Sequence, residues 1–236
     1  MIAPLSEAPS SPRPNRIAVL VSGRGSNLQA ILDAIEAGGL PACVVGVFSD
    51  KPAAAALERV EPALRWSATP KDYASREVFD AALGDAIEAT QPDWIVCAGY
   101  LRILCDAFVE RFRGRLLNIH PSLLPKYPGL RTHARAIADG EAEHGASVHF
   151  VIPELDAGTV VAQARVPIHP GDDADALAAR VLEIEHPLLI AVLRLAVSGR
   201  LAEQGTTTTL DGHGLFTPLL LDSAGALRAP GAEHPV

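Results

Sequence analysis

Short, wholly apolar segments alternate along this chain with longer amphipathic ones, and this pattern limits its fold more than any other feature. The apolar segments have strand length and lie at 17–21, 44–48, 94–98 and 116–119. The segments between them predict helices, at 28–35, at 53–60 and, with Ser75 as N-cap, at 76–89. Strands without a polar face, separated by helices, indicate a mostly parallel sheet that helices cover on both faces. We therefore predict an α/β fold.

The second half of the chain is less regular. Strands are predicted at 147–151 and 159–166, joined by a loop that contains proline and glycine. A long helix follows, which Asp172 or Asp173 begins as N-cap. Because proline cannot donate a helical hydrogen bond, we expect Pro187 to kink or interrupt this helix.

Turn residues near the end of the chain separate two further apolar segments. Residues 206–210 and 215–221 flank the sequence Asp-Gly-His-Gly, which predicts a C-terminal hairpin. We find no internal repeat and no linker. We therefore expect one domain over 16–200, a disordered proline-rich tail over 1–15, and the hairpin and a tail over 201–236.

Composition excludes several classes of protein. The net charge is −8, so the chain lacks the excess of Lys and Arg that non-specific nucleic-acid binding requires. No run of 18 apolar residues without a charge is present, and the first residues do not form a signal peptide, so we expect no membrane span and a cytoplasmic protein. The histidines show no metal-ligand spacing, and the cysteines are too few and scattered for a disulfide framework or a zinc site, so no catalytic metal is expected. The cysteines are Cys43, Cys97 and Cys105.

A glycine-containing turn, residues 22–27, joins the first strand to the first helix. Gly25 allows a tight turn, and the free N–H groups of the helix N-terminus could bind a phosphate of a mononucleotide-like ligand. The dinucleotide fingerprint is not satisfied, because Leu28 stands where its third glycine would be, and the P-loop spacing is absent. The alternative interpretation is a structural turn that Ser26 caps.

Asn118 and His120 are the sharpest candidates for catalysis. Residues i and i+2 of a strand share a face, so both side chains are expected to project together at the end of a buried strand, where α/β sheets bind ligands. Both can donate a hydrogen bond to a developing oxyanion, and His can also move a proton. Asp156 lies in the loop between two later strands and would stabilise a protonated His120 if the two meet. The alternative is a polar pair that merely ends a strand.

Basic residues gather between residues 100 and 135 of this acidic chain. This segment contains seven Lys and Arg residues and only two acidic residues. Such a segment favours anionic small molecules, and the alternative is a solvated face without a ligand.

Five motifs together resemble phosphoribosylglycinamide formyltransferases, the folate-dependent transformylases of purine synthesis. The resemblance runs from about residue 16 to residue 200, and its longest motif surrounds Asn118 and His120. It implies a Rossmann-like fold and makes 16–200 a formyltransferase catalytic domain. The motifs are VLVSGRGSNLQAIL (19–32), CAGYLRIL (97–104), LLNIHPSLLPKYPG (116–129), HGASVHFV (144–151) and ELDAG (154–158).

The resemblance also implies a role for each residue that matches a family motif. The catalytic residues are Asn118, His120 and Asp156. The phosphate loop and the contact to the amine substrate are Gly25, Ser26, Asn27 and Glu185. The folate-binding residues are Arg76, Leu101, Arg102, Ile103, Leu104 and Asn118.

The implied reaction transfers the formyl group of 10-formyltetrahydrofolate to the amine of glycinamide ribonucleotide. Asn118 and protonated His120 would stabilise a tetrahedral oxyanion, and Asp156 would keep His120 charged. The partners are these two small molecules, without nucleic acid, membrane or metal, and the enzyme is expected as a monomer or a homodimer.

The sequence departs from the family pattern at a few positions. Arg24 lies between the two loop glycines, and Ala157 replaces a glycine that often follows the aspartate. After Glu185 and His186 the family commonly continues with Tyr-Pro, whereas Pro187 follows here, which puts the placement of Glu185 in question.

Three other functions share parts of this pattern. A formyltetrahydrofolate deformylase uses the same Asn, His and Asp but normally carries a regulatory domain ahead of this core. Methionyl-tRNA formyltransferase adds a C-terminal nucleic-acid-binding domain, which the acidic balance does not favour. A non-catalytic nucleotide- or folate-binding module would not need Asn118, His120 and Asp156 intact.

Overall fold

The computed structural model describes residues 13–204 and 207–230, so most of the predicted N-terminal tail lies outside the described part. The helices and strands, in chain order, are β1 (Asn15–Val21), α1 (Ser26–Glu36), β2 (Ala42–Ser49), the 3-10 helices η1 (Ala55–Arg59) and η2 (Pro62–Leu64), β3 (Arg65–Ser67), η3 (Pro70–Asp72), α2 (Arg76–Ala89), β4 (Trp94–Cys97), α3 (Asp106–Arg111), β5 (Leu116–His120), α4 (Thr132–Ala138), β6 (Glu143–Phe150), β7 (Val160–Pro167), α5 (Ala174–Val197), β8 (Leu201–Gln204), β9 (Thr207–Leu210), β10 (His213–Gly214), β11 (Leu219–Leu221) and β12 (Leu227–Arg228).

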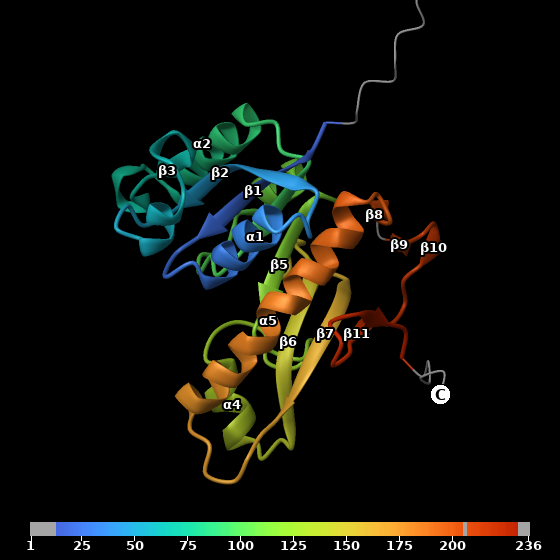
Figure 1. Ribbon diagram of the computed structural model, residues 1–236. Coiled ribbons are helices and arrows are strands. Elements are labelled where there is room, and N and C mark those ends of the chain that lie inside the picture. Colours follow the sequence, from blue (N-terminus) through green and yellow to red (C-terminus); the bar gives the residue numbers. More distant parts are fainter. Residues whose placement is uncertain (1–12, 205–206, 231–236) are drawn as a thin grey trace, which may run out of the picture.

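One large sheet organises the molecule (Figure 1). Its nine strands follow the order β12-β11-β7-β6-β5-β4-β1-β2-β3. The strands from β5 to β3 are parallel to their neighbours, β11 is parallel to β7, and β6 runs antiparallel to both β5 and β7. The prediction of an α/β fold with a mostly parallel sheet is therefore confirmed.

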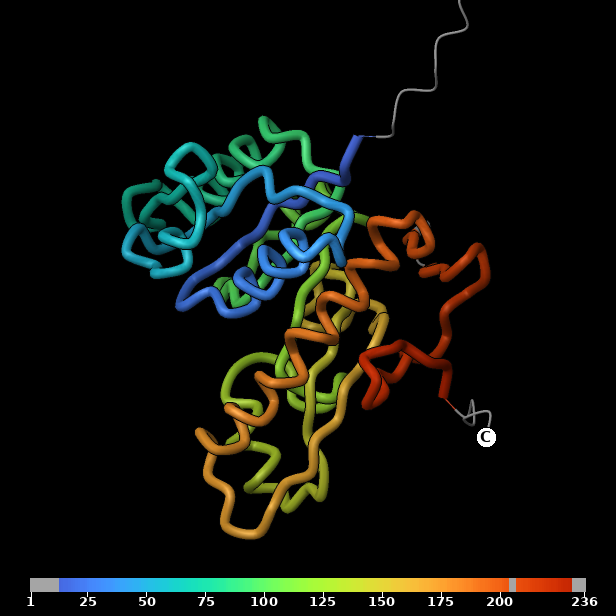
Figure 2. Tube along the Cα trace, viewed as in Figure 1, coloured from blue at the N-terminus to red at the C-terminus, as the bar shows by residue number. Residues whose placement is uncertain are grey.

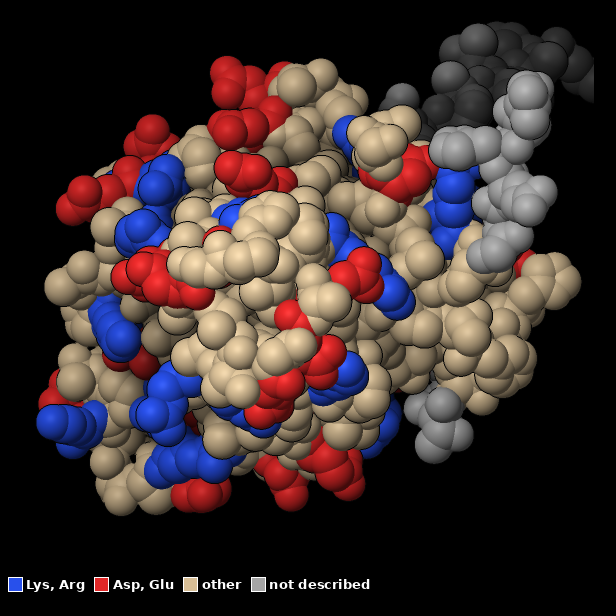
Figure 3. All heavy atoms as spheres, turned by 90° about the horizontal axis from the view of Figure 1, so that it is seen from below, with Lys and Arg blue, Asp and Glu red and all other residues tan. Residues whose placement is uncertain are grey.

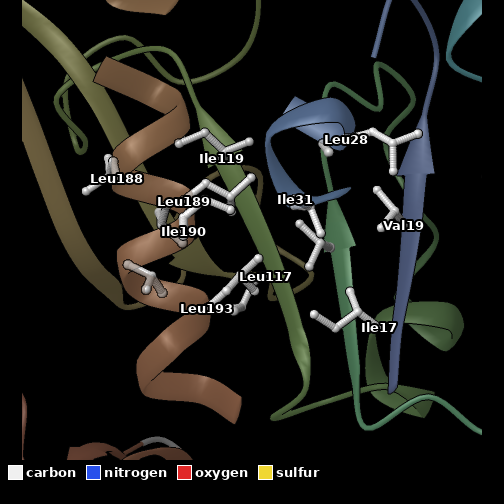
Figure 4. Close-up of a cluster of buried hydrophobic side chains, with 14 of the residues drawn as sticks. Ile17, Val19, Leu28, Ile31, Leu117, Ile119, Leu188, Leu189, Ile190 and Leu193 are labelled. Atoms are coloured by element: carbon white, nitrogen blue, oxygen red, sulfur yellow. The ribbon is translucent and has the colours of Figure 1, made fainter. Parts of the chain in front are cut away.

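Helices cover both faces of this sheet, as predicted. On one face, Leu28 of α1 lies beside Val19 of β1, and Leu193 of α5 lies beside Leu117 of β5 (Figure 4). Burying each side chain of this size contributes about 1.5–3 kcal/mol to the free energy of unfolding. On the other face, α2 and α3 contribute to a second apolar cluster that includes Phe79, Leu83, Phe108 and Phe112.

The long helix α5 crosses the sheet diagonally, which the Cα trace in Figure 2 shows most clearly. Asp173 is its N-cap and accepts a hydrogen bond from the Ala176 N–H at 2.8 Å. Pro187 does not interrupt the helix, because the residues that follow it are buried against the sheet and this packing offsets the missing hydrogen bond. Although α5 has 24 residues, neither it nor any other helix in the described ranges is long and apolar enough to cross a membrane.

Two predictions about secondary structure were wrong. The helix expected over 53–60 is only the 3-10 helix η1. The C-terminal hairpin is shorter than predicted: β10 pairs with β9 across the Asp211–Gly212 turn, and β8 pairs with β9 on its other side. Leu219 instead pairs in register with Ala162 of β7. There it covers an edge of the large sheet that would otherwise leave backbone groups unpaired, and a local turn pattern cannot predict that pairing.

Candidate active site

A cavity of about 850 Å³ opens at the carboxyl ends of β4 and β5. This is the edge of a parallel sheet at which α/β proteins bind ligands. Most of the residues singled out from the sequence line it: Asn27, Leu101, Arg102, Ile103, Leu104, Asn118, His120, Asp156 and Glu185. Gly25, Ser26 and Arg76 are not among the lining residues.

Asn118 and His120 share one face of β5, as predicted. Leu117 and Ile119 alternate with them and point toward α5 (Figure 4). The two polar side chains therefore lie on the opposite face, where both line the cavity.

The structure brings Asp156 to His120, which the sequence left open. Asp156 Oδ2 lies 3.5 Å from His120 Nδ1, and both side chains are buried. His120 Nε2 donates to the Tyr127 carbonyl oxygen at 3.0 Å. Each ring nitrogen of His120 therefore has an oxygen atom nearby, from the Tyr127 carbonyl on one side and from the Asp156 carboxylate on the other.

A second histidine, His149, belongs to this group, and the sequence analysis gave it no role. It lies opposite Asn118 in the antiparallel pairing of β5 and β6. Its Nδ1 donates to the Phe150 carbonyl at 2.8 Å, so its Nε2 is free to accept a hydrogen bond from Asn118 Nδ2 at 3.1 Å. Burial lowers the pKa of His149 to about 4, which keeps this acceptor unprotonated at neutral pH.

The turn that carries Asp156 is tightly constrained. Asp156 has a left-handed backbone, with φ +52°, and its Oδ2 accepts a hydrogen bond from the Gly129 N–H at 2.8 Å. At Gly158 a Cβ atom would lie 1.9 Å from the Phe150 carbonyl oxygen, so only glycine fits there. Ala157 does not have a left-handed backbone, so this position does not require glycine.

The turn before α1 is not capped by Ser26, in contrast to the alternative interpretation of this turn as a purely structural one. The N-cap is Gly25, with φ +75°, and Ser26 is the first helical residue, so Ser26 does not cap the helix. A Cβ atom at Gly25 would lie 2.5 Å from Cβ of Ala56 in η1. The first N–H groups of α1 have no partner within the helix and are therefore available to an anion.

Asn27 and Glu185 form one unit, although they lie 158 positions apart in the sequence. Asn27 Nδ2 donates to Glu185 Oε2 at 2.8 Å, which links the first turn of α1 to the middle of α5. Both side chains are buried and line the cavity. Glu185 therefore reaches the site although Pro187 follows it.

Arg76 does not line the cavity but contacts the backbone of a segment that does. Its Nη2 donates to the Leu104 carbonyl oxygen at 2.5 Å, and buried Asp80 accepts from the Cys105 N–H at 2.7 Å. At the other end of this segment, the Leu101 N–H donates to Ser22 Oγ at 3.0 Å. The segment from Leu101 to Leu104 is thus held at both ends, while the side chains of Leu101 and Ile103 remain exposed.

Six of the seven cations in the basic segment fall into two groups, and the seventh, Arg115, donates to the Pro92 carbonyl at 3.1 Å. Three of the six pair with acidic residues and lose their attraction for a ligand: Arg111, Arg113 and Lys126. Three others line the cavity: Arg102, Arg131 and Arg135. On the face drawn in Figure 3, cationic and anionic side chains alternate, so this face presents no large surface of one sign.

No group of three or more side chains that could hold a metal ion is found within the described residues. The histidines, carboxylates and arginines that line the cavity are His120, His133, His149, Asp156, Glu185, Arg102, Arg131 and Arg135.

The sequence and the structure agree with known proteins of one kind. The formyl transferase family matches residues 15–193. Phosphoribosylglycinamide formyltransferase of Escherichia coli (strain K12) is 47% identical over 201 residues, which cover 84% of this chain and 95% of that protein. The solved structure of phosphoribosylglycinamide formyltransferase from Coxiella burnetii, in complex with CHES, matches with a TM-score of 0.79 at 44% identity and covers 86% of this chain and 96% of the solved chain. Glycinamide ribonucleotide transformylase 1 from Symbiobacterium toebii matches with a TM-score of 0.81 at 39% identity, over 87% of this chain and 98% of the solved chain.

The chain belongs to the formyltransferase family. Its agreement over nearly the whole length of these relatives is more specific than the family match. Within the family it is an enzyme of the phosphoribosylglycinamide formyltransferase type, a transferase of purine biosynthesis. The resemblance seen in the five sequence motifs is thereby confirmed.

We predict that removing the charge of the buried Glu185 stabilises the protein at neutral pH but not at acidic pH. Burial raises the pKa of its carboxyl, so the folded protein binds this proton more tightly than the unfolded chain does. The stabilising effect of the proton is complete below the unfolded pKa and is lost as the pH rises through the folded pKa. Glu185→Gln keeps an acceptor for Asn27 without the charge, and we expect its Tm to exceed that of the unchanged protein at pH 7 but not at pH 4.

Calorimetry at the two pH values tests this expectation. Glu183→Gln is the matched control, since Glu183 is exposed on the same helix. An equal rise in Tm for both variants, or at both pH values, would show that burial of Glu185 is not the cause.

Proposed function

We propose that the enzyme transfers the formyl group of 10-formyltetrahydrofolate to the amine of glycinamide ribonucleotide. The observation that carries this proposal is the convergence of Asn118, His120 and Asp156 at a cavity that also contains Asn27 and Glu185. Asn27 and Glu185 flank the other three residues in the sequence, yet both groups line one space, as a reaction between two bound molecules requires.

The cavity and the turn beside it would offer a separate place for each substrate. The N-terminus of α1, with Gly25, Ser26 and Asn27, would bind the phosphate of the ribonucleotide, and Glu185 would bind its amine end. Leu101 and Ile103 line the same cavity and are more than half exposed. They would contact the flat rings of the folate, together with Arg102 and Leu104, while Arg76 holds their backbone.

Asn118 would stabilise the charge that develops on the formyl oxygen. When the amine nitrogen attacks the formyl carbon, the electron pair of the C=O bond moves to oxygen and a tetrahedral intermediate forms. One N–H of Asn118 Nδ2 is donated to His149, which orients the amide and leaves its second N–H for the oxyanion. His149 is thus a positioning residue in this proposal.

His120 would provide the second donor and assist the proton transfer. The contact with Asp156 favours the imidazolium form. To donate to the oxyanion, Nε2 must release the Tyr127 carbonyl. The attacking nitrogen loses a proton, a water carries it to the leaving folate nitrogen, and the intermediate collapses to the formylated amide and tetrahydrofolate.

A single assay tests the proposed reaction. Purified protein is mixed with 10-formyltetrahydrofolate, with and without glycinamide ribonucleotide, and tetrahydrofolate and the formylated product are quantified. We expect release only with the amine, in a one-to-one ratio with product. Release of tetrahydrofolate at the same rate without glycinamide ribonucleotide would instead indicate a deformylase, in which water attacks the formyl carbon.

The phosphate loop predicts a specific effect on substrate binding. Gly25→Ala places a Cβ atom 2.5 Å from Cβ of Ala56 on a left-handed backbone, so the turn before α1 must shift. We expect the KM for glycinamide ribonucleotide to rise by about tenfold or more, since a helix-terminus anion site depends on backbone position. The KM for the folate should change little.

Gly23→Ala is the matched control for this prediction. Gly23 lies in the same turn, but a Cβ atom there has no neighbour within 4 Å and its φ is not left-handed. If both variants raise the KM for glycinamide ribonucleotide equally, the geometry of Gly25 is not what binds the phosphate.

We extend the proposal to organisation and location. Residues 16–200 would form the catalytic domain, in agreement with the family match over 15–193. The three cysteines are free thiols in the structure, which suits a reducing cytoplasm.

A further inference from the structure

A row of polar side chains crosses the sheet next to the proposed catalytic residues. His120 of β5 pairs in register with Ser147 of β6, and Ser147 pairs with Gln163 of β7. Residues directly opposite on neighbouring strands share a face, so all three lie on the face away from α5. Ser147 and Gln163 are 0% and 6% exposed, and the mechanism described above uses neither.

Ser147 and Gln163 hold the backbone of the segment that follows His120. Ser147 Oγ donates to the Ser122 carbonyl at 2.7 Å and accepts from the Leu124 N–H at 3.1 Å and from Gln163 Nε2 at 2.9 Å. With its second N–H, Gln163 Nε2 donates to the Leu124 carbonyl at 2.8 Å. The hydroxyl group and the NH₂ group thus use all their hydrogen-bonding capacity on this segment and on each other.

The other end of the same segment reaches the reacting groups. The Tyr127 carbonyl accepts from His120 Nε2 at 3.0 Å, and the Gly129 N–H donates to Asp156 Oδ2 at 2.8 Å. The segment is also packed directly on the sheet, because a Cβ atom at Gly145 would lie 2.8 Å from Cδ2 of Leu123. A displacement at its start would therefore be transmitted to the contacts that orient His120 and Asp156.

We propose that Gln163 is a positioning residue for formyl transfer: it fixes the start of the segment whose far end orients His120 and Asp156. Gln163 does not line the cavity, so it acts through this backbone and not through substrate contact. The inference rests on the proposed function, because it assigns Gln163 a part in that same reaction.

Two variants of Gln163 remove its hydrogen bonds while keeping a side chain of similar volume. Gln163→Leu removes the carboxamide but keeps an apolar side chain of similar size, and Gln163→Glu keeps the shape but replaces the NH₂ donor by oxygen. We expect both to lower kcat by about 10–100-fold, since small displacements of positioned groups cost rates of this order. Both KM values should change by less than about threefold, because the cavity walls that bind the substrates are unchanged.

Asn15→Leu is the matched control. Asn15 Nδ2 also donates to a buried backbone carbonyl, that of Val197 at 2.8 Å, but at the end of β1 remote from the cavity. It should lower stability in the same way while leaving kcat within about twofold of the unchanged protein, because it touches no group in the reaction. Hydrogen exchange of the peptide that spans 121–129 supplies a second measurement, and faster exchange is expected only in the Gln163 variants.

The outcomes distinguish the two proposals. If the unchanged protein does not transfer a formyl group to glycinamide ribonucleotide, the proposed function fails. If it does, and the folded Gln163 variants keep the kcat of Asn15→Leu, or lose activity only through KM, Gln163 is not a positioning residue. Unchanged exchange in 121–129 alongside a lowered kcat would also overturn the inference.

Discussion

Asn118→Ala is expected to lower kcat by about 10²–10³-fold, the usual loss when one oxyanion donor is removed. The structure gives the reason. One N–H of the Asn118 amide is occupied by His149 Nε2, and the other is left for the formyl oxygen at the cavity. Alanine removes both, while β5 keeps its backbone pairing with β4 and β6, so the fold should remain.

Steady-state kinetics with both substrates saturating measures this loss, and circular dichroism checks the fold. Asn15→Ala replaces a partly buried asparagine of β1 that is not among the residues lining the cavity, and it should keep nearly full kcat. A near-normal rate for Asn118→Ala would remove this side chain from the mechanism.

Asp156→Asn is expected to lower kcat by about 10³–10⁴-fold, by analogy with the loss seen when a histidine loses its orienting carboxylate in other enzymes. Asparagine still offers an oxygen to the Gly129 N–H, so the turn should keep its shape. It removes the negative charge 3.5 Å from His120 Nδ1. Without that charge the imidazolium form is less favourable.

The pH dependence of kcat is the measurement that identifies this cause. If Asp156 acts through the charge on His120, the pH profile of kcat should differ between Asp156→Asn and the unchanged protein. Asp72→Asn, an exposed position on η3, serves as the control. A reduced rate with an unchanged pH profile would mean that Asp156 acts only by shaping the turn.

Several features of the site follow from local sequence patterns. The two-residue period of a strand places Asn118 and His120 on one face, and the glycines and free N–H groups of the turn at 22–27 belong to one short segment. Such patterns involve residues within a few positions of one another. They are therefore decided by backbone geometry, and the structure agrees with them.

His149 and Gln163 could not be found in this way. Their roles depend on which residues face them across β5, β6 and β7, and a shift of one residue in register would turn their side chains to the α5 face. One signal was present in the sequence: His149 is an ionisable residue between the apolar Val148 and Phe150 of β6. Its partner, Asn118, could be identified only once the pairing was known.

Arg76 and the predicted hairpin show the same limitation. The family motif predicted a folate contact for Arg76, whereas the structure places its guanidinium on the Leu104 carbonyl. Leu219 was predicted to pair within a hairpin, but it pairs with Ala162 at the edge of β7. In both cases a distant element competes with the local pattern.

The main buried strands, the helices α1, α2 and α5 that cover them, and the pair Asn118–His120 were determined by the sequence itself, because apolar periodicity and strand geometry act over a few residues. The tertiary structure alone decided that Asp156 meets His120, that Asn27 meets Glu185, and that Gln163 holds the segment after His120. These contacts join residues 36, 158 and 39 positions apart, and no local pattern sets the register and packing that bring them together.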